Sequence, residues 1–410
     1  MVPAGRKRLC AAGYPMDVGE KGCPMPEFSR QYVNLPSYAL ADVPKIKAEL
    51  AEKGVDVIDL GAGDADQMPP AQAVETLQQA VTEERFNRYP FSRGLPEFRL
   101  KISEWMQRRF GFEMDPFAEI LPLIGSKEGI AHLPIVYLNP GDAAIMPDPG
   151  YYPYFGGTFL LGGEAIEVPL RAENGFLLDW SEVPEEKLAG AKILYLNYPN
   201  NPTGGIATDE YFQEALEFCR AHDLLLVNDN AYSEIAFDGY RPPSVLQYEG
   251  AREVAVEFHS LSKTYNMTGW RIGWVAGHKE TIGAMTKVKP YLDTGAFLAC
   301  QAAGVAALDA WPEFVTKNVA IFKERRDAAV NAFRQAGFQV ESPRATMYLW
   351  IPIPGGEPSV DFARRILQES GVVLFPGAGM GSGGEGYFRV ALTKPATRLE
   401  EAARRVAEVL

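Results

Sequence analysis

The residues best able to do chemistry lie in one short segment, Glu257-Phe-His-Ser-Leu-Ser-Lys-Thr-Tyr-Asn-Met-Thr-Gly-Trp-Arg271. The segment places Lys263 among hydroxyl side chains, just beyond an apolar run that is typical of a buried strand. Ser260, Ser262 and Arg271 could hold a phosphate dianion, because hydroxyls and a guanidinium donate well to phosphate oxygens. The Lys263 amine could then form an imine with a phosphorylated carbonyl compound. A simply solvated lysine is the alternative.

Two other apolar runs also end in polar side chains. The run ending at Leu196 leads into Asn197-Tyr-Pro-Asn-Asn201-Pro-Thr-Gly204, a rigid polar turn that an ordinary Pro/Gly turn explains equally well. The run ending at Val227 delivers Asp229 and then Tyr232, although Asp229 could instead cap a helix. Ligand groups in open α/β sheets gather at the carboxyl ends of strands, so these three strand ends are the first candidates for a site.

Three further stretches could bind anions or a flat ring. Gly125-Ser126-Lys127 lies between a strand and a helix start, where free N–H groups bind phosphate, unless the stretch is a plain helix cap. Tyr151, on a turn rich in proline and tyrosine, could stack on a ring or pack in a core. Arg389 lies inside an apolar strand and therefore needs an anion, which a structural carboxylate could supply as well as a substrate carboxylate.

Several other kinds of site are disfavoured. The glycine run Gly377-Ala-Gly-Met-Gly-Ser-Gly-Gly384 imitates a dinucleotide-binding turn, but a predicted strand at 387–392 follows it where a helix is required. No nucleophile elbow is present in the sequence, so serine-hydrolase chemistry is not expected. A metal site is not expected either, because the four histidines lack metal-binding spacing: His132, His222, His259 and His278.

Composition narrows the class of protein. The 410 residues include 40 Lys+Arg against 53 Asp+Glu, a formal charge of −13, which disfavours nucleic acid as a partner. The chain has 47% hydrophobic and 23% charged residues, which argues against disorder, and no run approaches the ~18 apolar residues of a membrane span. The four cysteines lack CxxC spacing and no secretory signal is recognisable, so we expect reduced thiols and a cytoplasmic protein.

The order of apolar segments predicts how these residues are positioned. Helical patterns alternate with short strands between about 70 and 300, which indicates a largely parallel sheet covered by helices, with room for one antiparallel pair. A mixture of helices and strands follows, including a predicted strand near 338–341, and indicates a smaller α+β lobe. The predicted domains are an N-terminal tail or arm (1–34), a small domain (35–68 and 300–410) and a large domain (69–299).

Three motifs together resemble the class I/II aminotransferases, which are pyridoxal-phosphate enzymes of fold type I. They are Tyr-Pro-Asn-Asn-Pro-Thr-Gly (198–204), Asp-Asn-Ala-Tyr (229–232) and Ser-Leu-Ser-Lys (260–263) with Arg271. The resemblance extends from about residue 30 to the C-terminus. It implies an α/β fold, with a mostly parallel seven-stranded sheet sandwiched by helices in a large domain, and a smaller α+β domain. It also implies pyridoxal 5′-phosphate as cofactor, amino-acid and 2-oxo-acid substrates, and a homodimer with shared active sites.

The same resemblance implies roles for individual residues. Lys263 would carry the cofactor and move the proton between the substrate α-carbon and the cofactor's C4′, Asp229 would keep the ring nitrogen protonated, and Tyr232 would hydrogen-bond the ring oxygen. The other implied cofactor ligands are Gly125, Ser126, Lys127, Tyr151, Asn201, Ser260, Ser262 and Arg271, with Tyr89 reaching the phosphate of a neighbouring subunit. The implied substrate ligands are Tyr38, Gly63, Asn201 and Arg389.

The substrate is suggested by smaller segments. Leu35-Pro-Ser-Tyr38 and Asp293-Thr-Gly-Ala-Phe297 are similar to bacterial LL-diaminopimelate aminotransferases and to their alanine- or aspartate-preferring relatives. The best interpretation is therefore transfer between LL-diaminopimelate and 2-oxoglutarate, with aspartate or alanine as alternative donors. Asp64-Ala-Asp-Gln67, Arg93 and Tyr152 depart from the usual pattern. Arg93 could recognise a distal carboxylate across the dimer interface.

Two other functions fit the same motifs. A pyridoxal-phosphate C–S or β-lyase would keep Lys263, Asp229 and Arg389 but release ammonia or pyruvate. A non-catalytic regulator that binds the cofactor would ordinarily bring a DNA-binding segment or a lost lysine, whereas Lys263 is present and the sequence has no basic helix-turn-helix segment.

Overall fold

The computed structural model describes residues 26–36, 43–91 and 93–410. The chain forms two units, residues 1–36 and 37–410. The described part of the first unit holds helix α1 (Arg30–Asn34), which begins where the Ser29 side chain accepts a hydrogen bond from the Tyr32 N–H. Tyr38 lies outside the described residues, as does most of the predicted N-terminal tail.

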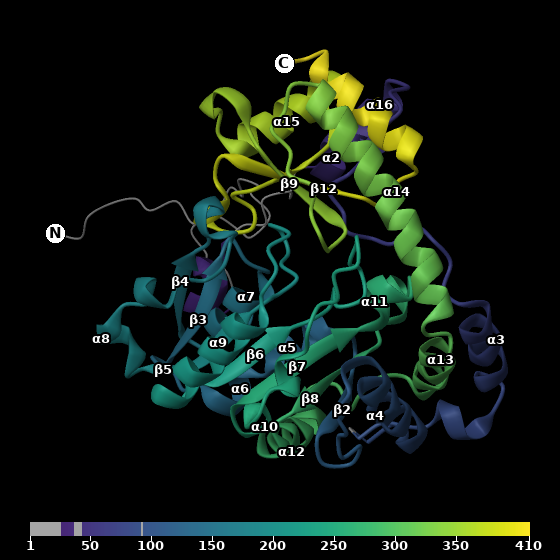
Figure 1. The fold of residues 1–410 in the computed structure, drawn as a ribbon, viewed down its shortest axis with the longest axis vertical. Coiled ribbons are helices and arrows are strands. Elements are labelled where there is room, and N and C mark those ends of the chain that lie inside the picture. Colours follow the sequence, from purple (N-terminus) through teal and green to yellow (C-terminus); the bar gives the residue numbers. More distant parts are fainter. Residues whose placement is uncertain (1–25, 37–42, 92) are drawn as a thin grey trace. The chain divides into compact units, whose positions relative to one another are not determined.

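A seven-stranded sheet runs through the second unit (Figure 1). Its strands are β2 (Ile120–Leu123), β3 (Ala143–Asp148), β4 (Glu164–Pro169), β5 (Ala191–Leu196), β6 (Leu225–Asp229), β7 (Ala255–Ser260) and β8 (Gly273–Gly277). In the order β2-β8-β7-β6-β5-β3-β4, the pairs that β8 forms with β2 and β7 are antiparallel and the other pairs are parallel. The prediction of a mostly parallel sheet is therefore confirmed, with both antiparallel pairs made by β8.

Helices cover both faces of this sheet. They are α3 (Ala71–Ala80), α4 (Pro96–Phe110), α5 (Ser126–His132), α6 (Pro134–Tyr137), α7 (Pro153–Leu160), α8 (Glu185–Leu188), α9 (Asp209–Ala221), α10 (Ala251–Val254), α11 (Leu261–Thr264), α12 (Lys279–Val288) and α13 (Leu298–Asp309). On β5, Leu194 and Leu196 pack into a core with α4, α9 and α13. Ile193 and Tyr195 pack into the opposite core with α5, α7 and α12. This alternation is expected of a strand that is buried on both faces.

A second sheet is antiparallel and has the order β11-β12-β9, and a separate parallel pair joins β1 to β10. These strands are β1 (Ile58–Asp59), β9 (Tyr348–Pro352), β10 (Val372–Val373), β11 (Phe375–Pro376) and β12 (Tyr387–Ala391). The remaining helices are α2 (Val43–Glu52), α14 (Glu313–Gln335), α15 (Ser359–Ser370) and α16 (Ala396–Ala407). In Figure 1, α14 runs from beside α13 to α16, and α14, α15, α16 and the second sheet share one core.

The strand predicted near 338–341 is wrong. No described strand pairs with this segment, and the Arg334 side chain instead donates two hydrogen bonds to the Val340 carbonyl. Phe338 and Val340 are nevertheless buried, which explains why their alternation imitated a strand.

The core around the second sheet supports the division into a large domain (69–299) and a small domain (35–68 and 300–410), which remains a proposal.

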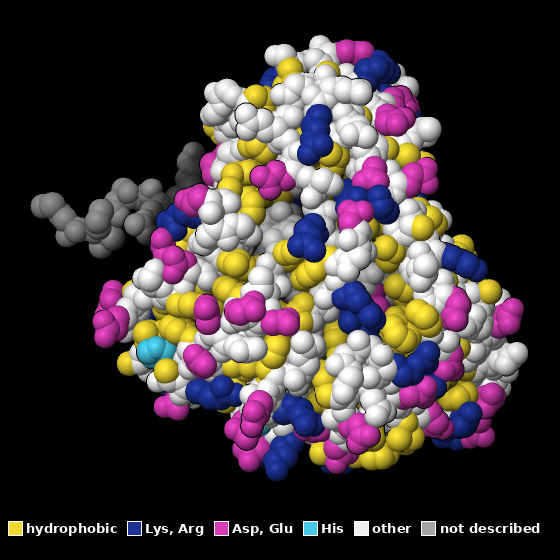
Figure 2. Space-filling view, in the orientation of Figure 1, with side chains coloured by type: hydrophobic (Ala, Val, Ile, Leu, Met, Phe, Trp, Pro, Cys, Tyr) yellow, Lys and Arg dark blue, Asp and Glu magenta, His cyan; other side chains and the backbone are white. Residues whose placement is uncertain are grey.

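The described surface mixes charges of both signs. In Figure 2, Asp and Glu side chains lie among the Lys and Arg side chains on the face shown. None of the helices in the described ranges combines the length and the apolar character needed to span a bilayer.

A buried polar network joins β6 to β7. The Glu257 carboxylate is fully buried and accepts four hydrogen bonds, from Asn228 Nδ2 (2.9 Å), Ser244 Oγ (2.7 Å), the Val245 N–H (2.9 Å) and His259 Nε2 (2.8 Å). Burial alone would raise the pKa of Glu257, but the hydrogen bond and charge of His259, with the Ser244 and Asn228 bonds, hold this pKa below its usual value. The carboxylate therefore fastens together the two strand ends that carry Asp229 and Ser260.

Glu257→Gln is expected to lower the free energy of unfolding at pH 7 by about 1–3 kcal/mol, because the amide replaces a buried carboxylate oxygen that accepts hydrogen bonds by an NH2 group that cannot accept them. A carboxyl group whose folded pKa is lowered stabilises the protein above its unfolded pKa, near 4.5, and this stabilisation is lost as the pH falls through the folded pKa. The deficit of the variant should therefore shrink below about pH 4.5. Urea unfolding at pH 7 and pH 4 measures both, with exposed Glu249→Gln as the control. Equal stability of Glu257→Gln and the parent at pH 7 would contradict the role of the network.

Candidate active site

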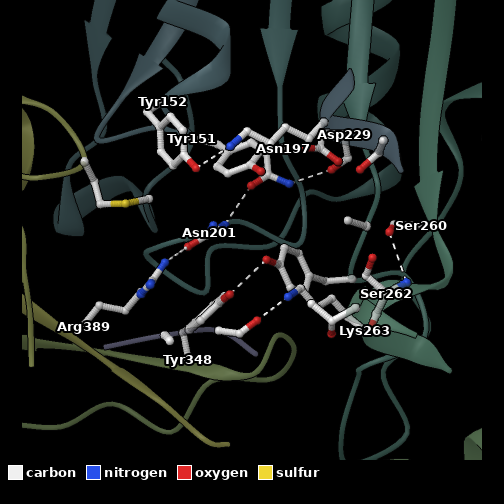
Figure 3. Close-up of a pocket in the computed structure, with 18 of the residues that line it drawn as sticks. Tyr151, Tyr152, Asn197, Asn201, Asp229, Ser260, Ser262, Lys263, Tyr348 and Arg389 are labelled. Atoms are coloured by element: carbon white, nitrogen blue, oxygen red, sulfur yellow. Dashed lines mark hydrogen bonds between the residues drawn. The ribbon is translucent and has the colours of Figure 1, made fainter. Parts of the chain in front are cut away.

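The carboxyl ends of β5, β6 and β7 open into a cavity of about 310 Å³ (Figure 3). Residues of the second sheet complete its lining, so the cavity lies between the two sheets. The lining residues are Gly61, Ala62, Gly63, Ser126, Lys127, Tyr151, Tyr152, Asn197, Asn201, Asp229, Ala231, Tyr232, Ser260, Ser262, Lys263, Thr268, Arg271, Tyr348, Phe375, Met380 and Arg389. All three polar strand ends singled out in the sequence thus meet at one place.

Asp229 is the last residue of β6 and is only 3% exposed. Tyr154 donates a hydrogen bond to its Oδ2 (2.9 Å), and Asn197 Nδ2 donates to its backbone carbonyl (2.6 Å). Burial raises the pKa of Asp229 to about 6, although the bonds from Tyr154 and the Ala231 N–H act in the opposite direction. Oδ1 is buried without a partner among the described residues. A protonated ring nitrogen is the kind of donor that this oxygen lacks.

Hydroxyl groups and a guanidinium gather around Lys263. Ser262 donates its backbone N–H to Ser260 Oγ (3.1 Å), and Arg271 Nη1 lies 3.5 Å from Ser262 Oγ. The Lys263 Nζ contacts the Gly63 carbonyl. Arg271 lies against Gly125 at the start of α5, and the first N–H groups of a helix have no partner within the helix. The set fits a phosphate group close to an amine.

Gly125 allows this arrangement. Its φ of +72° is unfavourable for other residues, and a Cβ there would lie 2.5 Å from Arg271 Nη2. Any side chain at this position would therefore displace the guanidinium from the start of α5.

Arg389 extends from β12 toward the opposite side of the cavity (Figure 3). Its Nη1 donates to Asn201 Oδ1 (2.7 Å) and its Nη2 to the Gly61 carbonyl (2.9 Å), both neutral acceptors. No carboxylate of the described residues pairs with it, and its buried Nε has no hydrogen-bond partner there. The sequence left two possible partners for Arg389, a structural carboxylate or a substrate carboxylate. The described residues supply no structural carboxylate, so the guanidinium is available to a carboxylate ligand.

Tyr348 was not anticipated from the sequence. It begins β9 and is 3% exposed, and its hydroxyl lies 3.2 Å from the Tyr232 hydroxyl. Arg389 lies over its ring, with the guanidinium carbon 4.2 Å from the ring centroid. Gly63 permits this position, because a Cβ on Gly63 would overlap the Tyr348 hydroxyl.

Three predicted ligands, Gly125, Tyr89 and Arg93, are not among the residues that line the cavity, and of these Gly125 immediately precedes Ser126, which does. Tyr89 is 73% exposed, and Arg93 lies in a separate depression with Arg99 and Phe117. Their predicted roles involve a second subunit, so these roles stay predictions. Tyr38 lies outside the described residues.

Sequence reasoning also missed Asn197 and Tyr154, both partners of Asp229. Asn197 immediately follows β5, and this position could have singled it out. Tyr154 sits on α7 among other aromatic residues, and its contact with Asp229 has no signal in the local pattern.

Asp229→Asn is expected to stabilise the cofactor-free protein above pH 6, because the buried carboxylate is disfavoured there and an amide carries no charge. A raised folded pKa means that the native state is penalised above about pH 6 and progressively less toward pH 3.8. The expected gain is about 1–3 kcal/mol at pH 8 and smaller at pH 5. Thermal unfolding at the two pH values measures it, with exposed Asp361→Asn as the control. A loss of stability at pH 8 would show that the carboxylate is compensated inside the protein.

Known proteins resemble this chain over most of its length. The family model for class I and II aminotransferases matches residues 55–406. The LL-diaminopimelate aminotransferase of Desulforudis audaxviator (strain MP104C) is 48% identical over 373 residues, which cover 91% of this chain and 95% of that protein. The enzyme of the same name from Moorella thermoacetica is 47% identical over 382 residues and covers 93% and 98%.

Solved structures give the same result. Substrate-bound BacF from Bacillus subtilis superposes with a TM-score of 0.90 at 33% identity and covers 94% of this chain and 98% of that one. A probable N-succinyldiaminopimelate aminotransferase from Thermus thermophilus has a TM-score of 0.86 at 37% identity, with coverage of 91% and 100%. The family depends on pyridoxal phosphate and acts on amino acids and 2-oxo acids. On sequence, on fold and on the family model alike, the chain belongs to the class I and II aminotransferases.

Proposed function

We propose that this aminotransferase binds pyridoxal 5′-phosphate in the cavity and moves an amino group between LL-diaminopimelate and 2-oxoglutarate. One observation carries the proposal: Asp229 and Arg389 face the cavity that Lys263 lines, each with a buried atom that has no partner among the described residues. A protonated ring nitrogen would satisfy Asp229 Oδ1, and a substrate α-carboxylate would pair with Arg389.

The cofactor would be held by residues on three sides. The phosphate would lie against Ser126, Ser260, Ser262 and Arg271, with Gly125 and the Lys127 backbone at the start of α5. Tyr151 would stack on the ring, and Asn201 and Tyr232 would donate hydrogen bonds to the ring oxygen. Bound pyridoxal phosphate supplies an electron sink for charge that develops at the substrate α-carbon.

Lys263 would do the proton transfer. Its amine would take the proton from the substrate α-carbon and deliver it to C4′, while Arg389, Asn201 and the Gly63 backbone orient the substrate carboxylate. Asp229 would stay ionised beside the ring nitrogen, because the positive charge there offsets the cost of burying its carboxylate.

A second cation in the cavity supports a donor with a second carboxylate. Lys127 lines the cavity at the start of α5, and its Nζ donates to the Tyr152 hydroxyl (2.6 Å) and lies 4.5 Å from the Tyr152 ring centroid. A distal carboxylate of LL-diaminopimelate or aspartate could pair with this amine, whereas alanine has none. The relatives named as LL-diaminopimelate aminotransferases support the first of these donors.

We further propose a cytoplasmic homodimer with shared active sites. Tyr89 and Phe91 are 73% and 75% exposed, and exposed aromatic residues are typical of protein interfaces. Because Tyr89 does not line the cavity of its own chain, it could reach the phosphate in the partner. Arg93 could approach a distal substrate carboxylate in the same way.

Lys263→Ala is expected to lower the transamination rate by about 10²–10⁴-fold or more, because the proton-transfer group is lost. The purified variant should still fold and bind pyridoxal phosphate noncovalently. Turnover with LL-diaminopimelate and 2-oxoglutarate, together with the absorbance of bound cofactor, measures both. Exposed Lys279→Ala serves as the matched control. Near-parental turnover in Lys263→Ala would contradict the assignment.

A single-turnover screen identifies the donor. The cofactor-loaded enzyme, mixed with one amino acid at a time, should convert its yellow cofactor to the amine form far faster with LL-diaminopimelate than with alanine or aspartate. Faster conversion by aspartate, alanine or glutamate would overturn the choice of donor while leaving the reaction type intact.

The same screen tests the other two functions. Release of ammonia or pyruvate without a new amino acid would indicate a C–S or β-lyase. Bound cofactor that no amino acid converts would indicate a non-catalytic regulator.

A further inference from the structure

Tyr348 lies where the two halves of the proposed site meet. Its hydroxyl is 3.2 Å from the hydroxyl of Tyr232, the proposed donor to the ring oxygen. Its ring lies against the guanidinium of Arg389, the proposed carboxylate ligand, at 4.2 Å. The Tyr348 side chain therefore contacts one residue on the cofactor side and one residue on the substrate side of the proposed site.

The pairing of two strands explains this position of Tyr348. β9 and β12 are antiparallel neighbours, with Tyr348 opposite Ala391 and Trp350 opposite Arg389. Tyr348 and Arg389 are thus diagonal neighbours on one face of the sheet, close enough for side-chain contact. Gly63 leaves the space that the hydroxyl occupies, because any larger residue would overlap it.

The surroundings of the hydroxyl are positively charged. The groups that act on it are Arg389 from β12, Lys263 from α11, Tyr232 after β6 and Tyr151 before α7. Burial raises the pKa of Tyr348, whereas the positive charges of Arg389 and Lys263 act in the opposite direction, and the pKa lies below its usual value. A more acidic phenol is a stronger hydrogen-bond donor. If the Tyr232 hydroxyl directs its own proton at the ring oxygen, it must accept the hydrogen bond that it shares with Tyr348.

We propose that Tyr348 is a positioning residue with two separable functions in this reaction. Its hydroxyl donates to Tyr232 and so strengthens the hydrogen bond from Tyr232 to the cofactor's ring oxygen, since hydrogen bonds in a chain polarise one another. Its ring holds the Arg389 guanidinium in the plane that receives the substrate carboxylate. The inference rests on the proposed function.

Two variants separate the hydroxyl from the ring. Tyr348→Phe removes only the hydroxyl, so the pH at which the visible absorbance of the bound cofactor titrates should rise by about 0.2–0.7 pH units. The KM for the amino acid should change less than about twofold, because the ring remains on Arg389. Tyr348→Leu removes the ring, and the KM for both the amino acid and 2-oxoglutarate should rise about tenfold.

A role in packing alone would give a different result. Tyr348 also belongs to the core shared by β9 and β12, so a packing role predicts a lower melting temperature without a change in the absorbance titration of Tyr348→Phe. Tyr240→Phe is the matched control, because the Tyr240 hydroxyl donates to the Ala207 carbonyl and Tyr240 does not line the cavity. The control should leave the titration and both KM values unchanged.

Each result bears on a defined claim. An unmoved titration in Tyr348→Phe overturns the function of the hydroxyl, and unmoved KM values in Tyr348→Leu overturn that of the ring. If the parent protein with added pyridoxal phosphate shows no visible absorbance band, the proposed function itself fails and the inference fails with it.

Discussion

Two buried charges of opposite sign dominate the cavity, Asp229 on β6 and Arg389 on β12. Neither is paired with an oppositely charged side chain among the described residues, and each is held by neutral hydrogen-bonding groups. Leaving such charges uncompensated costs several kcal/mol, which a protein with large cores on both sides of the cavity can tolerate. Under the proposed function, a ligand that brings a cation to Asp229 and an anion to Arg389 would recover this cost, so the unliganded site would sacrifice stability for binding.

The two charges belong to different sheets, so the relation between the sheets sets the distance that a ligand must span. Several contacts fix that relation. Arg326 on α14 pairs with Asp238 (2.6 Å), which follows β6, and the Ser382 hydroxyl donates to Asp148 (2.7 Å) at the end of β3. Tyr232 and Tyr348 meet at the same boundary. A ligand bound to both Asp229 and Arg389 would add a further link across it.

Two glycines make room for the side chains that line the cavity. Gly63 leaves room for the Tyr348 hydroxyl, and Gly125 leaves room for Arg271 at the start of α5. On the opposite face of the sheet from Asp229, the hydrogen bonds of Glu257 fasten β6 to β7. The polar groups of the cavity are thus held by a buried carboxylate that never reaches it, which limits how far the strand ends can move.

Much of the fold and site could be read from local patterns. Apolar runs separated by helices dictate a parallel sheet, and parallel strands place their carboxyl ends at one edge. For this reason Asn201, Asp229 and Lys263, each at the end of a strand or within five residues after it, could be expected to converge. The strand predicted near 338–341 was wrong because an alternating apolar pattern indicates burial and does not indicate a strand that pairs with the segment.

Periodicity and spacing along the chain were enough to predict a largely parallel sheet and the residues at its strand ends, and the resemblance of the motifs added the family and the number of strands. Only the tertiary structure decided that Arg389 lacks a carboxylate partner, that Tyr154 and Asn197 support Asp229, and that Tyr348 joins Tyr232 to Arg389. Those contacts join residues far apart in the chain, 32 positions for Asn197 and Asp229 and 116 for Tyr232 and Tyr348. They are set by how strands and helices pack in three dimensions, which no local pattern records.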